Sequence, residues 1–356
     1  MLKILLLLLS FISISSQSAQ FKVVFINPGF ADNNTTGDFW SNVTQFMSAA
    51  ANDLDIELVT FYTQRDHIFM NSLAESVINE QPDFAILVNE KGKVLELIKE
   101  LTSANIPVFF LLNRLSPSEL SLLSESQKSL IKGSVVPDNV LVGQKLIDGL
   151  VEQYYISHPK KDDKQNINLL ALQGDFTTPA SIDREKGLLT SLSHYDNVTL
   201  IDSTVANWSE QQAYEKVKGI IKRAPIDIIW AANDPMAVGA RRAIAELNLP
   251  YPTIIGGVNW DIVDPKSAID LSFGGHVTLG AYALILLDDI FNHGLTSEQV
   301  EQKIAIFESS LSSNYPRYIQ FLSENNFEQF DFSQFSYSGN RRLTFSIKNM
   351  LNTAPH

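Results

Sequence analysis

The chain of 356 residues contains no cysteine. It can therefore form no disulfide, offers no lipoprotein attachment site and cannot bind a metal through sulfur. The six histidines, at positions 67, 158, 194, 276, 293 and 356, are scattered, and none has a metal-ligating partner at helical spacing. The sequence thus predicts no metal and no cofactor. A 45% hydrophobic composition over this length is enough to build the cores of two lobes.

Long hydrophobic runs are also missing. Beyond the N-terminus, no window reaches the roughly 18 apolar residues of a membrane-spanning helix. At the N-terminus, Lys3 precedes an apolar stretch that starts at Ile4 and ends before Ser16-Gln17-Ser18-Ala19, small residues typical of a signal-peptidase site. We expect a cleavable signal peptide over residues 1–19, export to the periplasm and a soluble mature chain. A retained N-terminal anchor is the alternative.

Positive charge is scarce as well, because the formal net charge is -13. A nucleic-acid partner requires a basic stripe, and this charge balance argues against such a partner. Three catalytic signatures are missing: a Gly-x-Ser-x-Gly elbow, a phosphate-binding Gly-x-x-x-x-Gly-Lys loop and a His-Glu-x-x-His zinc helix. We therefore expect no enzyme. A periplasmic hydrolase or transferase remains the alternative, with Asp234 and His276 as its candidate pair.

What the sequence does contain is a regular alternation of strand-like and helix-like segments. Amphipathic helical stretches, such as 39–54, 93–104, 140–155 and 211–222, separate most of the apolar strands. Such alternation predicts an α/β fold of two doubly wound parallel-sheet lobes joined by a multi-strand hinge. The expected strands are 22–27, 56–61, 84–88, 107–111, 131–136, 167–172, 198–203, 226–231, 253–255 and 268–273.

The boundary between the lobes is expected near residues 136–139, where Asp138 or Asn139 can cap a new helix. The segment 302–308 reads as one further strand, and the Phe-rich residues 320–337 read as an ordered extension rather than a flexible tether. The predicted domains are the signal peptide 1–19, an N-terminal lobe of 20–137 plus 275–304, a C-terminal lobe of 138–274 plus 305–312, and a C-terminal extension, 313–356, packed on a lobe.

One apolar strand stops at Asn233 and Asp234, and a helix starts there. In open α/β sheets, ligands bind in the crevice at the carboxyl ends of the strands. This position predicts that both side chains face a ligand, although either one could also cap the helix. A ligand-binding protein is therefore the first functional hypothesis.

Several segments resemble the type I periplasmic solute-binding proteins, the superfamily of ribose and galactose binders, and within it the autoinducer-2 receptor. The resemblance extends from about residue 21 to 308. It implies a bilobal receptor that closes over a small polar ligand. It rests on Val24-Phe25-Ile26-Asn27-Pro28, Asp38-Phe39-Trp40, Ile182-Asp183-Arg184-Glu185-Lys186-Gly187 and Ala232-Asn233-Asp234-Pro235-Met236-Ala237-Val238-Gly239-Ala240.

The ligand site is expected to combine aromatic and polar side chains. Phe39 and Trp40 begin a helix after a polar loop, and the planar fork of Arg184 suits adjacent hydroxyls or a carboxylate. Trp208 is either a stacking aromatic or a lobe-surface residue, and His276 is either a hinge residue or a ligand contact. By the resemblance, the remaining candidates are Asn89, Asn113, Arg114 and, in place of a family aspartate, Asn259.

The resulting hypothesis is a periplasmic, non-catalytic receptor for a carbohydrate or a sugar-like signal. Asn113 and the Val258-Asn259 segment depart from the aspartates of sugar binders, which implies a ligand with fewer or differently placed hydroxyl donors. The closed form would be read by the permease of an ABC importer or by the periplasmic domain of a sensor kinase or cyclase. The free protein is expected to be monomeric. A transcription regulator with the same core is the other alternative, although it would need a basic helix-turn-helix.

Overall fold

The structure is a computed structural model that describes residues 19–31, 37–159, 165–246, 252–261, 268–337 and 342–354. The expected signal peptide lies outside these residues, apart from Ala19. Within the described ranges, no helix has both the length and the apolar character needed to cross a membrane.

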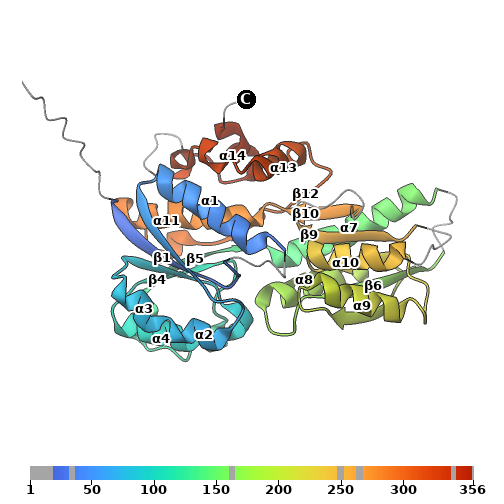
Figure 1. Cartoon of the computed structure of the whole chain (residues 1–356), viewed down its shortest axis with the longest axis horizontal. Helices are drawn as coiled ribbons and strands as arrows, with labels where there is room; N and C mark the ends of the chain where they lie inside the picture. The colour runs from blue at the N-terminus through green and yellow to red at the C-terminus, as the bar shows by residue number, and fades with distance from the viewer. Residues whose placement is uncertain are drawn as a thin grey trace, which may run out of the picture.

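Two parallel sheets form the centres of two lobes, which lie side by side in Figure 1. The first sheet has the strand order β11-β5-β4-β3-β1-β2 and the second has the order β12-β10-β9-β8-β6-β7. Only β12, among the described strands, pairs antiparallel to its neighbour, β10. The strands are β1 (Phe21–Asn27), β2 (Ile56–Tyr62), β3 (Phe84–Leu87), β4 (Val108–Leu111), β5 (Ile131–Pro137), β6 (Ile167–Gln173), β7 (Val198–Val205), β8 (Ile228–Ala231), β9 (Ile254–Asn259), β10 (Leu271–Gly274), β11 (Glu301–Ile304) and β12 (Glu308–Ser309).

Helices cover the sheets, and the predicted fold class of two doubly wound lobes is confirmed. In the first lobe, alternate residues of β1 pack into different layers: Val23 and Phe25 join the core beside α1, whereas Val24 and Ile26 join the core beside α3 and α4. The main helices are α1 (Phe39–Asp53), α2 (His67–Ser72), α3 (Ala74–Asn79), α4 (Leu95–Ser103), α5 (Pro117–Leu120), α6 (Glu125–Ser129), α7 (Asn139–Ser157), α8 (Pro179–Leu192), α9 (Glu210–Ile220), α10 (Asp234–Ala245), α11 (Leu279–His293), α12 (Ser297–Val300), α13 (Tyr315–Glu324) and α14 (Ile347–Thr353).

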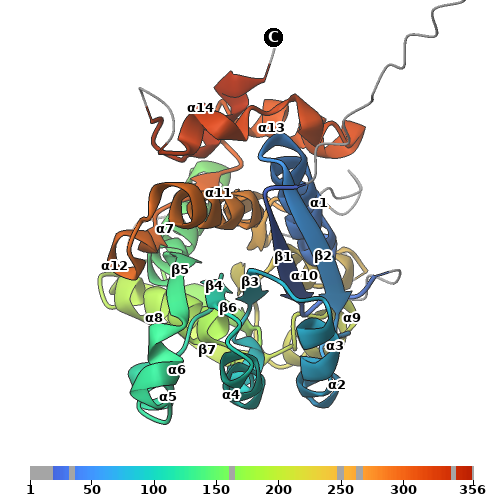
Figure 2. The same cartoon turned by 90° about the vertical axis from the view of Figure 1, so that its left-hand side faces the viewer.

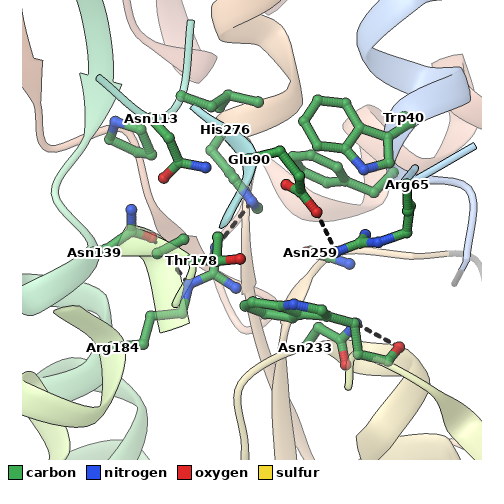
Figure 3. Close-up of a pocket in the computed structure, with 15 residues that line it drawn as sticks. Trp40, Arg65, Glu90, Asn113, Asn139, Thr178, Arg184, Asn233, Asn259 and His276 are labelled. Atoms are coloured by element: carbon green, nitrogen blue, oxygen red, sulfur yellow. Dashed lines mark hydrogen bonds and ion pairs between the residues drawn. The ribbon is translucent and has the colours of Figure 1, made fainter. Parts of the chain in front are cut away.

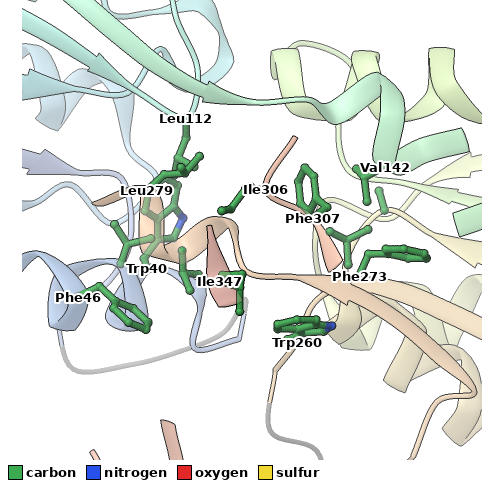
Figure 4. Packing of buried hydrophobic residues seen from close by; sticks show 14 of the residues in the cluster. Trp40, Phe46, Leu112, Val142, Trp260, Phe273, Leu279, Ile306, Phe307 and Ile347 are labelled. Atoms are coloured by element: carbon green, nitrogen blue, oxygen red, sulfur yellow. The ribbon is translucent and has the colours of Figure 1, made fainter. Parts of the chain in front are cut away.

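The chain passes between the lobes at three places: 137–139, 274–276 and 304–308. The expectation of one strand over 302–308 is wrong, because β11 joins the first sheet and β12 joins the second. Between them, Ile306 and Phe307 are buried. Figure 4 shows these two side chains within a hydrophobic cluster that continues from Trp40 in the first lobe to Phe273 in the second. The same core therefore supports both lobes in this arrangement.

The described residues beyond β12, 310–337 and 342–354, form a layer on the first lobe, above α1 and α11 in Figures 1 and 2. The ring of Phe46 in α1 stacks on Tyr318 and meets Phe327 edge-on. An Asp53 carboxylate oxygen accepts the amide N–H groups of Phe332 and Ser333, at 2.8 and 3.0 Å. Aromatic packing and backbone hydrogen bonds thus fix this C-terminal extension to the lobe.

Candidate functional site

A single pocket between the lobes gathers most of the predicted residues (Figure 3). Its empty space is about 580 Å³, a volume that includes the mouth where the pocket meets solvent. The lining residues are Phe39, Trp40, Arg65, Glu90, Leu112, Asn113, Pro137, Asn139, Thr178, Ala180, Arg184, Trp208, Asn233, Asn259 and His276.

Aromatic side chains at the start of α1 form one wall. The Phe39 and Trp40 rings meet edge-on with centroids 5.0 Å apart, and Phe39 lies 4.8 Å from the His276 ring. Trp40 packs directly on Gly29, where a Cβ atom would lie 2.4 Å from the Trp40 Cβ. The missing side chain at Gly29 therefore lets the indole lie against the loop that follows β1.

Arg184 organises the wall of the second lobe. Its Nε donates to Asn139 Oδ1 at 3.0 Å, its Nη1 to the Ala232 carbonyl at 2.5 Å, and its Nη2 lies 3.2 Å from His276 Nε2. Burial lowers the pKa of this guanidinium to about 9, and the charge of Asp234 opposes the shift. Each of the three guanidinium nitrogens of Arg184 has a protein partner. Arg184 therefore links Asn139, Ala232 and His276 and stabilises this wall of the pocket.

The contact with Arg184 also sets the state of His276. A guanidinium can only donate, so Nε2 of His276 must accept, and the neutral ring carries its proton on Nδ1. Burial, and then the charge of Arg184, hold the pKa of His276 well below its usual value, in agreement with a neutral ring. Nδ1 is buried and has no hydrogen-bond partner among the described residues. The N–H at Nδ1 of His276 therefore has no acceptor among the described residues.

Trp208 lines the pocket, and both its indole N–H and its backbone carbonyl are hydrogen-bonded. Its Nε1 donates to Asp175 Oδ2 at 2.7 Å, and its carbonyl accepts Nδ2 of Asn233 at 3.1 Å. The Oδ1 atom of Asn233 accepts the N–H of Met236, so this side chain also caps α10. Trp208 has a left-handed φ of 60°, an unusual backbone state for a bulky residue. The Trp208 indole is therefore a fixed part of the pocket lining and is not a side chain on the lobe surface.

Asn259 completes the second-lobe wall and is backed by two buried carboxylates. Its Nδ2 donates to Asp261 Oδ2 at 3.1 Å, and the amide of Asp261 donates to Asp234 Oδ2 at 3.1 Å. Asp234 also accepts the Ser272 hydroxyl at 2.8 and 2.9 Å. Burial raises the pKa of Asp234 to about 6, and burial together with the charge of Asp234 raises the pKa of Asp261 well above its usual value.

Three predicted site residues lie elsewhere. Asn89 donates to the Arg114 carbonyl and to the Glu119 carboxylate, which turns its amide toward the α5 region. The Arg114 guanidinium pairs with Glu301 in a different surface hollow. Asp234 does not line the pocket, because its carboxylate accepts the Ser272 hydroxyl and the Asp261 N–H. The structure thus brings together Phe39, Trp40, Asn113, Arg184, Trp208, Asn233 and Asn259, and leaves out Asn89, Arg114 and Asp234.

Arg65 and Glu90, which were not among the expected site residues, form an ion pair in the pocket lining, with Arg65 Nη2 and Glu90 Oε1 2.7 Å apart. Burial raises the pKa of Glu90, and Arg65 partly offsets the rise. Glu90 could have been proposed, because it stands next to Asn89 at the same strand end. Nothing in the loop after β2 marked Arg65. Asp138 caps α7 by accepting the N–H of Leu141, which decides between the two expected caps.

Comparison with known proteins gives curated relatives that are similar over part of their length. The chain is 27% identical over 213 residues to a xylitol-binding protein of Mycolicibacterium smegmatis, which covers 59% of this chain and 55% of that protein. It is 29% identical over 93 residues to the HTH-type transcriptional regulator AscG of Escherichia coli, covering 25% of this chain and 27% of the regulator. The chain therefore spans about half the length, or less, of these curated relatives.

Solved structures extend the similarity to the whole fold. A periplasmic sugar-binding protein from Pseudomonas fluorescens matches with a TM-score of 0.79 and 26% identity, over 93% of this chain and 99% of that one. A galactofuranose-binding protein matches with a TM-score of 0.69 and 20% identity, over 85% and 99% of the two chains, which shows the fold alone. Residues 29–261 match the family model described as a periplasmic binding protein domain. Because that match covers more than half of the 356 residues, the chain belongs to the periplasmic binding protein family.

Proposed function

We propose that this protein binds a small carbohydrate or sugar-like ligand in the pocket between its lobes and closes over it. The observation that carries the proposal is that both lobes line one pocket: Phe39 and Trp40 come from the first, and Arg184 and Trp208 from the second. A ligand held by both walls stabilises the closed arrangement relative to an open one.

The chemistry of the walls supports a polyhydroxy ligand. Aromatic rings pack well on the C–H faces of a sugar, and few but fixed polar groups set its orientation. Two of those polar groups are buried and lack a hydrogen-bond partner among the described residues: Nδ1 of His276 and Oδ1 of Asn113. Hydroxyl groups can both donate and accept, so one ligand can satisfy both atoms.

The protein is proposed to act as a receptor without turnover. The carboxylate of Asp234, nominated with His276 for a hydrolase, is engaged by Ser272 and Asp261 on the far side of Asn259. A ligand recovered chemically unchanged after prolonged incubation agrees with this proposal. Turnover that Asp234→Asn abolishes would contradict it.

The periplasm is the proposed location, since the family is one of periplasmic binding proteins. Mass spectrometry of the N-terminus of the exported protein tests for removal of residues 1–19. An ABC permease is the first candidate partner, because a similar structure is described as the binding component of an arabinose ABC transporter. A sensor domain is the second candidate, and copurification of the closed protein with either membrane partner distinguishes them.

Thermal melting tests the binding proposal. The panel contains xylitol, arabinose, galactose, allose, myo-inositol and autoinducer-2, and a ligand at about 100 times its dissociation constant adds about 2.7 kcal/mol of stability. Arg184→Ala should abolish the ligand-induced rise in melting temperature, because Asn139, Ala232 and His276 lose the guanidinium group that hydrogen-bonds to all three. Arg242→Ala is the matched control, since Arg242 pairs with Glu210 away from the pocket. A shift that survives Arg184→Ala intact contradicts the proposed site.

A further inference from the structure

The C-terminal extension adds a connection between the lobes to the three crossings of the chain. Its first residue, Ser310, is bound to β10 of the second sheet: the Ser310 N–H donates to the Ser272 carbonyl at 2.7 Å, and the Ser310 hydroxyl accepts the Ser272 N–H at 3.0 Å. Farther along, the ring of Phe345 stacks on Tyr282 of α11 with centroids 4.3 Å apart. The extension thus begins on the second lobe and is anchored on the first.

Four aromatic side chains, which we call the aromatic bridge, continue this connection from one lobe to the other: Phe46, Tyr318, Tyr315 and Trp260. Tyr318 of α13 stacks on Phe46 of α1 with ring centroids 6.2 Å apart, and its ring lies 5.0 Å from the ring of Trp260. Tyr315, also in α13, meets the Trp260 ring edge-on at 5.2 Å. Because Trp260 directly follows β9, the bridge runs from the first lobe through the extension to the second lobe.

Trp260 is a fixed part of the second lobe. Its side chain is 1% exposed, and its Nε1 donates to the Ser272 carbonyl at 3.3 Å. Its backbone has a left-handed φ of 64°, a state that a bulky residue keeps only where the surrounding structure over-determines it. The preceding residue, Asn259, lines the pocket. The aromatic bridge therefore ends one residue from the pocket wall.

The extension also packs on the hinge itself. In the crossing at 274–276, Gly275 has a φ of 103°, and a Cβ atom there would lie 2.8 Å from Cδ1 of Ile347 in α14. A Cβ atom on Gly274 would lie 2.2 Å from Cγ of Trp260. Ile347 and Trp260 belong to the hydrophobic cluster of Figure 4. The missing side chains of both glycines thus let the extension and the second lobe pack against the same crossing.

The lobes are in contact beside the pocket in this arrangement. Gly37 lies just before α1 of the first lobe, and a Cβ atom there would lie 2.7 Å from Cγ of Pro235, at the start of α10, and 3.1 Å from Oδ2 of Asp261. Side chains from both lobes also line the one pocket. The arrangement that the aromatic bridge spans is therefore a closed one.

Opening of the lobes must break contacts of the extension, whichever lobe it follows. If the extension stays on α1 and α11, Trp260 moves away from Tyr315 and Tyr318. If it moves with the second lobe, Phe46 and Tyr282 lose their partners. Aromatic pairs are favourable only over a narrow range of separations, so a rigid-body rotation loses them.

We propose that the C-terminal extension restrains lobe opening: through the aromatic bridge it holds the second lobe in the closed arrangement. The bridge thereby sets the fraction of unliganded protein that is closed and, with it, the affinity of the pocket. This inference goes beyond the proposed function, because it concerns the equilibrium between lobe arrangements and not the chemistry of the ligand.

Distance measurements between the lobes test the proposal. Since the chain has no cysteine, Glu100→Cys in α4 and Glu215→Cys in α9 place one spin label on each lobe, at exposed positions outside the pocket. Both helices lie on the side of the molecule away from the extension in Figure 1, so opening should lengthen the distance between the labels. Without ligand, Tyr315→Ala should raise the ratio of open to closed protein by about 3- to 10-fold, because an aromatic pair is lost.

Ligand binding provides a second measurement on the same variant. The sugar of the panel that binds wild type best should return Tyr315→Ala to the short distance. Its dissociation constant should rise by up to about the same 3- to 10-fold, because part of the binding free energy is used to close the lobes.

Matched variants separate the bridge from other effects. Tyr315→Phe keeps the ring, and Tyr318→Phe removes only a buried hydroxyl that has no hydrogen-bond partner among the described residues, so both should behave as wild type. Tyr337→Ala removes a tyrosine of the extension that is 57% exposed and whose ring lies 5.6 Å from the Arg342 guanidinium, so it should change neither distance nor affinity. Melting curves check that each variant is folded. Tyr315→Leu, which keeps apolar volume without the ring, replaces Tyr315→Ala if the latter is not.

The outcomes separate the two proposals. If loss of the Tyr315 ring leaves the distances without ligand as in wild type or shortens them, or if Tyr337→Ala lengthens them equally, the restraint by the extension is refuted while ligand binding by the pocket stands. If no sugar of the panel binds wild type, the proposed function fails, and the distances without ligand still decide whether the extension restrains opening.

Discussion

The packing of α8 on α7 depends on the missing side chain of Gly187, and we expect Gly187→Ala to destabilise the second lobe. A Cβ atom there would lie 2.1 Å from the Val140 carbonyl oxygen and 2.9 Å from the Gln144 amide nitrogen. Both are backbone atoms, so the helices must separate. Overpacking costs about 3 kcal/mol when the backbone has to move, and alanine regains about 1 kcal/mol of helix propensity. The expected net loss is about 2 kcal/mol.

Gly219 provides the matched control. It lies near the end of α9, and apart from its chain neighbours and the backbone of its own helix no described atom lies within 4 Å of the Cβ that alanine would add. Gly219→Ala should therefore stabilise the protein by about 0.4–1 kcal/mol. Melting curves measure both effects, at about 2–4 °C per kcal/mol. Gly187→Ala should also weaken ligand binding, since Arg184 lies one helical turn before the clash. A Gly187→Ala protein that melts at or above the wild-type temperature would refute this reasoning.

Two further predictions concern buried groups outside the direct ligand contacts. The pKa of Asp234 is raised to about 6 in the folded protein, so the native state binds this proton more tightly than the unfolded chain does. The contribution of this carboxyl group to the free energy of unfolding therefore decreases as the pH rises from about 4 to about 7. The melting temperature of Asp234→Asn minus that of wild type should therefore increase across this range; a flat or falling difference would contradict it. Phe46→Ala should cost about 3–5 kcal/mol and expose the C-terminal extension to proteolysis, because Phe46 contacts Tyr318 and Phe327. Phe176→Ala, at a side chain 79% exposed, is the control and should stay within about 0.5 kcal/mol; equal losses for the two variants would show that the extension is not anchored by Phe46.

Much of the architecture could be predicted because it is encoded locally. Apolar strands that alternate with amphipathic helices determine two parallel sheets, and the carboxyl ends of such strands meet at one edge. Arg184, Trp208 and Asn233 could be placed at the cleft on this basis, supported by the family resemblance. The single strand expected over 302–308 was wrong because sequence periodicity cannot show that a short apolar segment, Ile306-Phe307, is a crossing between two sheets rather than part of one.

The orientation of neighbouring side chains could not be predicted. Asn89 and Glu90 both follow β3, yet Glu90 faces the pocket and Asn89 bonds to Glu119. After a strand ends, the turn rather than the strand period decides where each side chain points, and here the turn includes the left-handed Lys91. For the same reason, Asp234 contacts Ser272 although its neighbour Asn233 lines the pocket.

The sequence by itself determined the bilobal α/β fold and the edge of each sheet at which a ligand binds, because strand and helix periodicity are local properties. Only the tertiary structure decided which side chains share the pocket. The pairing of Arg65 with Glu90 joins loops after two strands that are not adjacent in the sheet, and it appears only once β1 lies between them. The charged groups that line the pocket, one carboxylate and two guanidinium groups, come together only through long-range contacts of this kind, which no segment of the sequence contains alone.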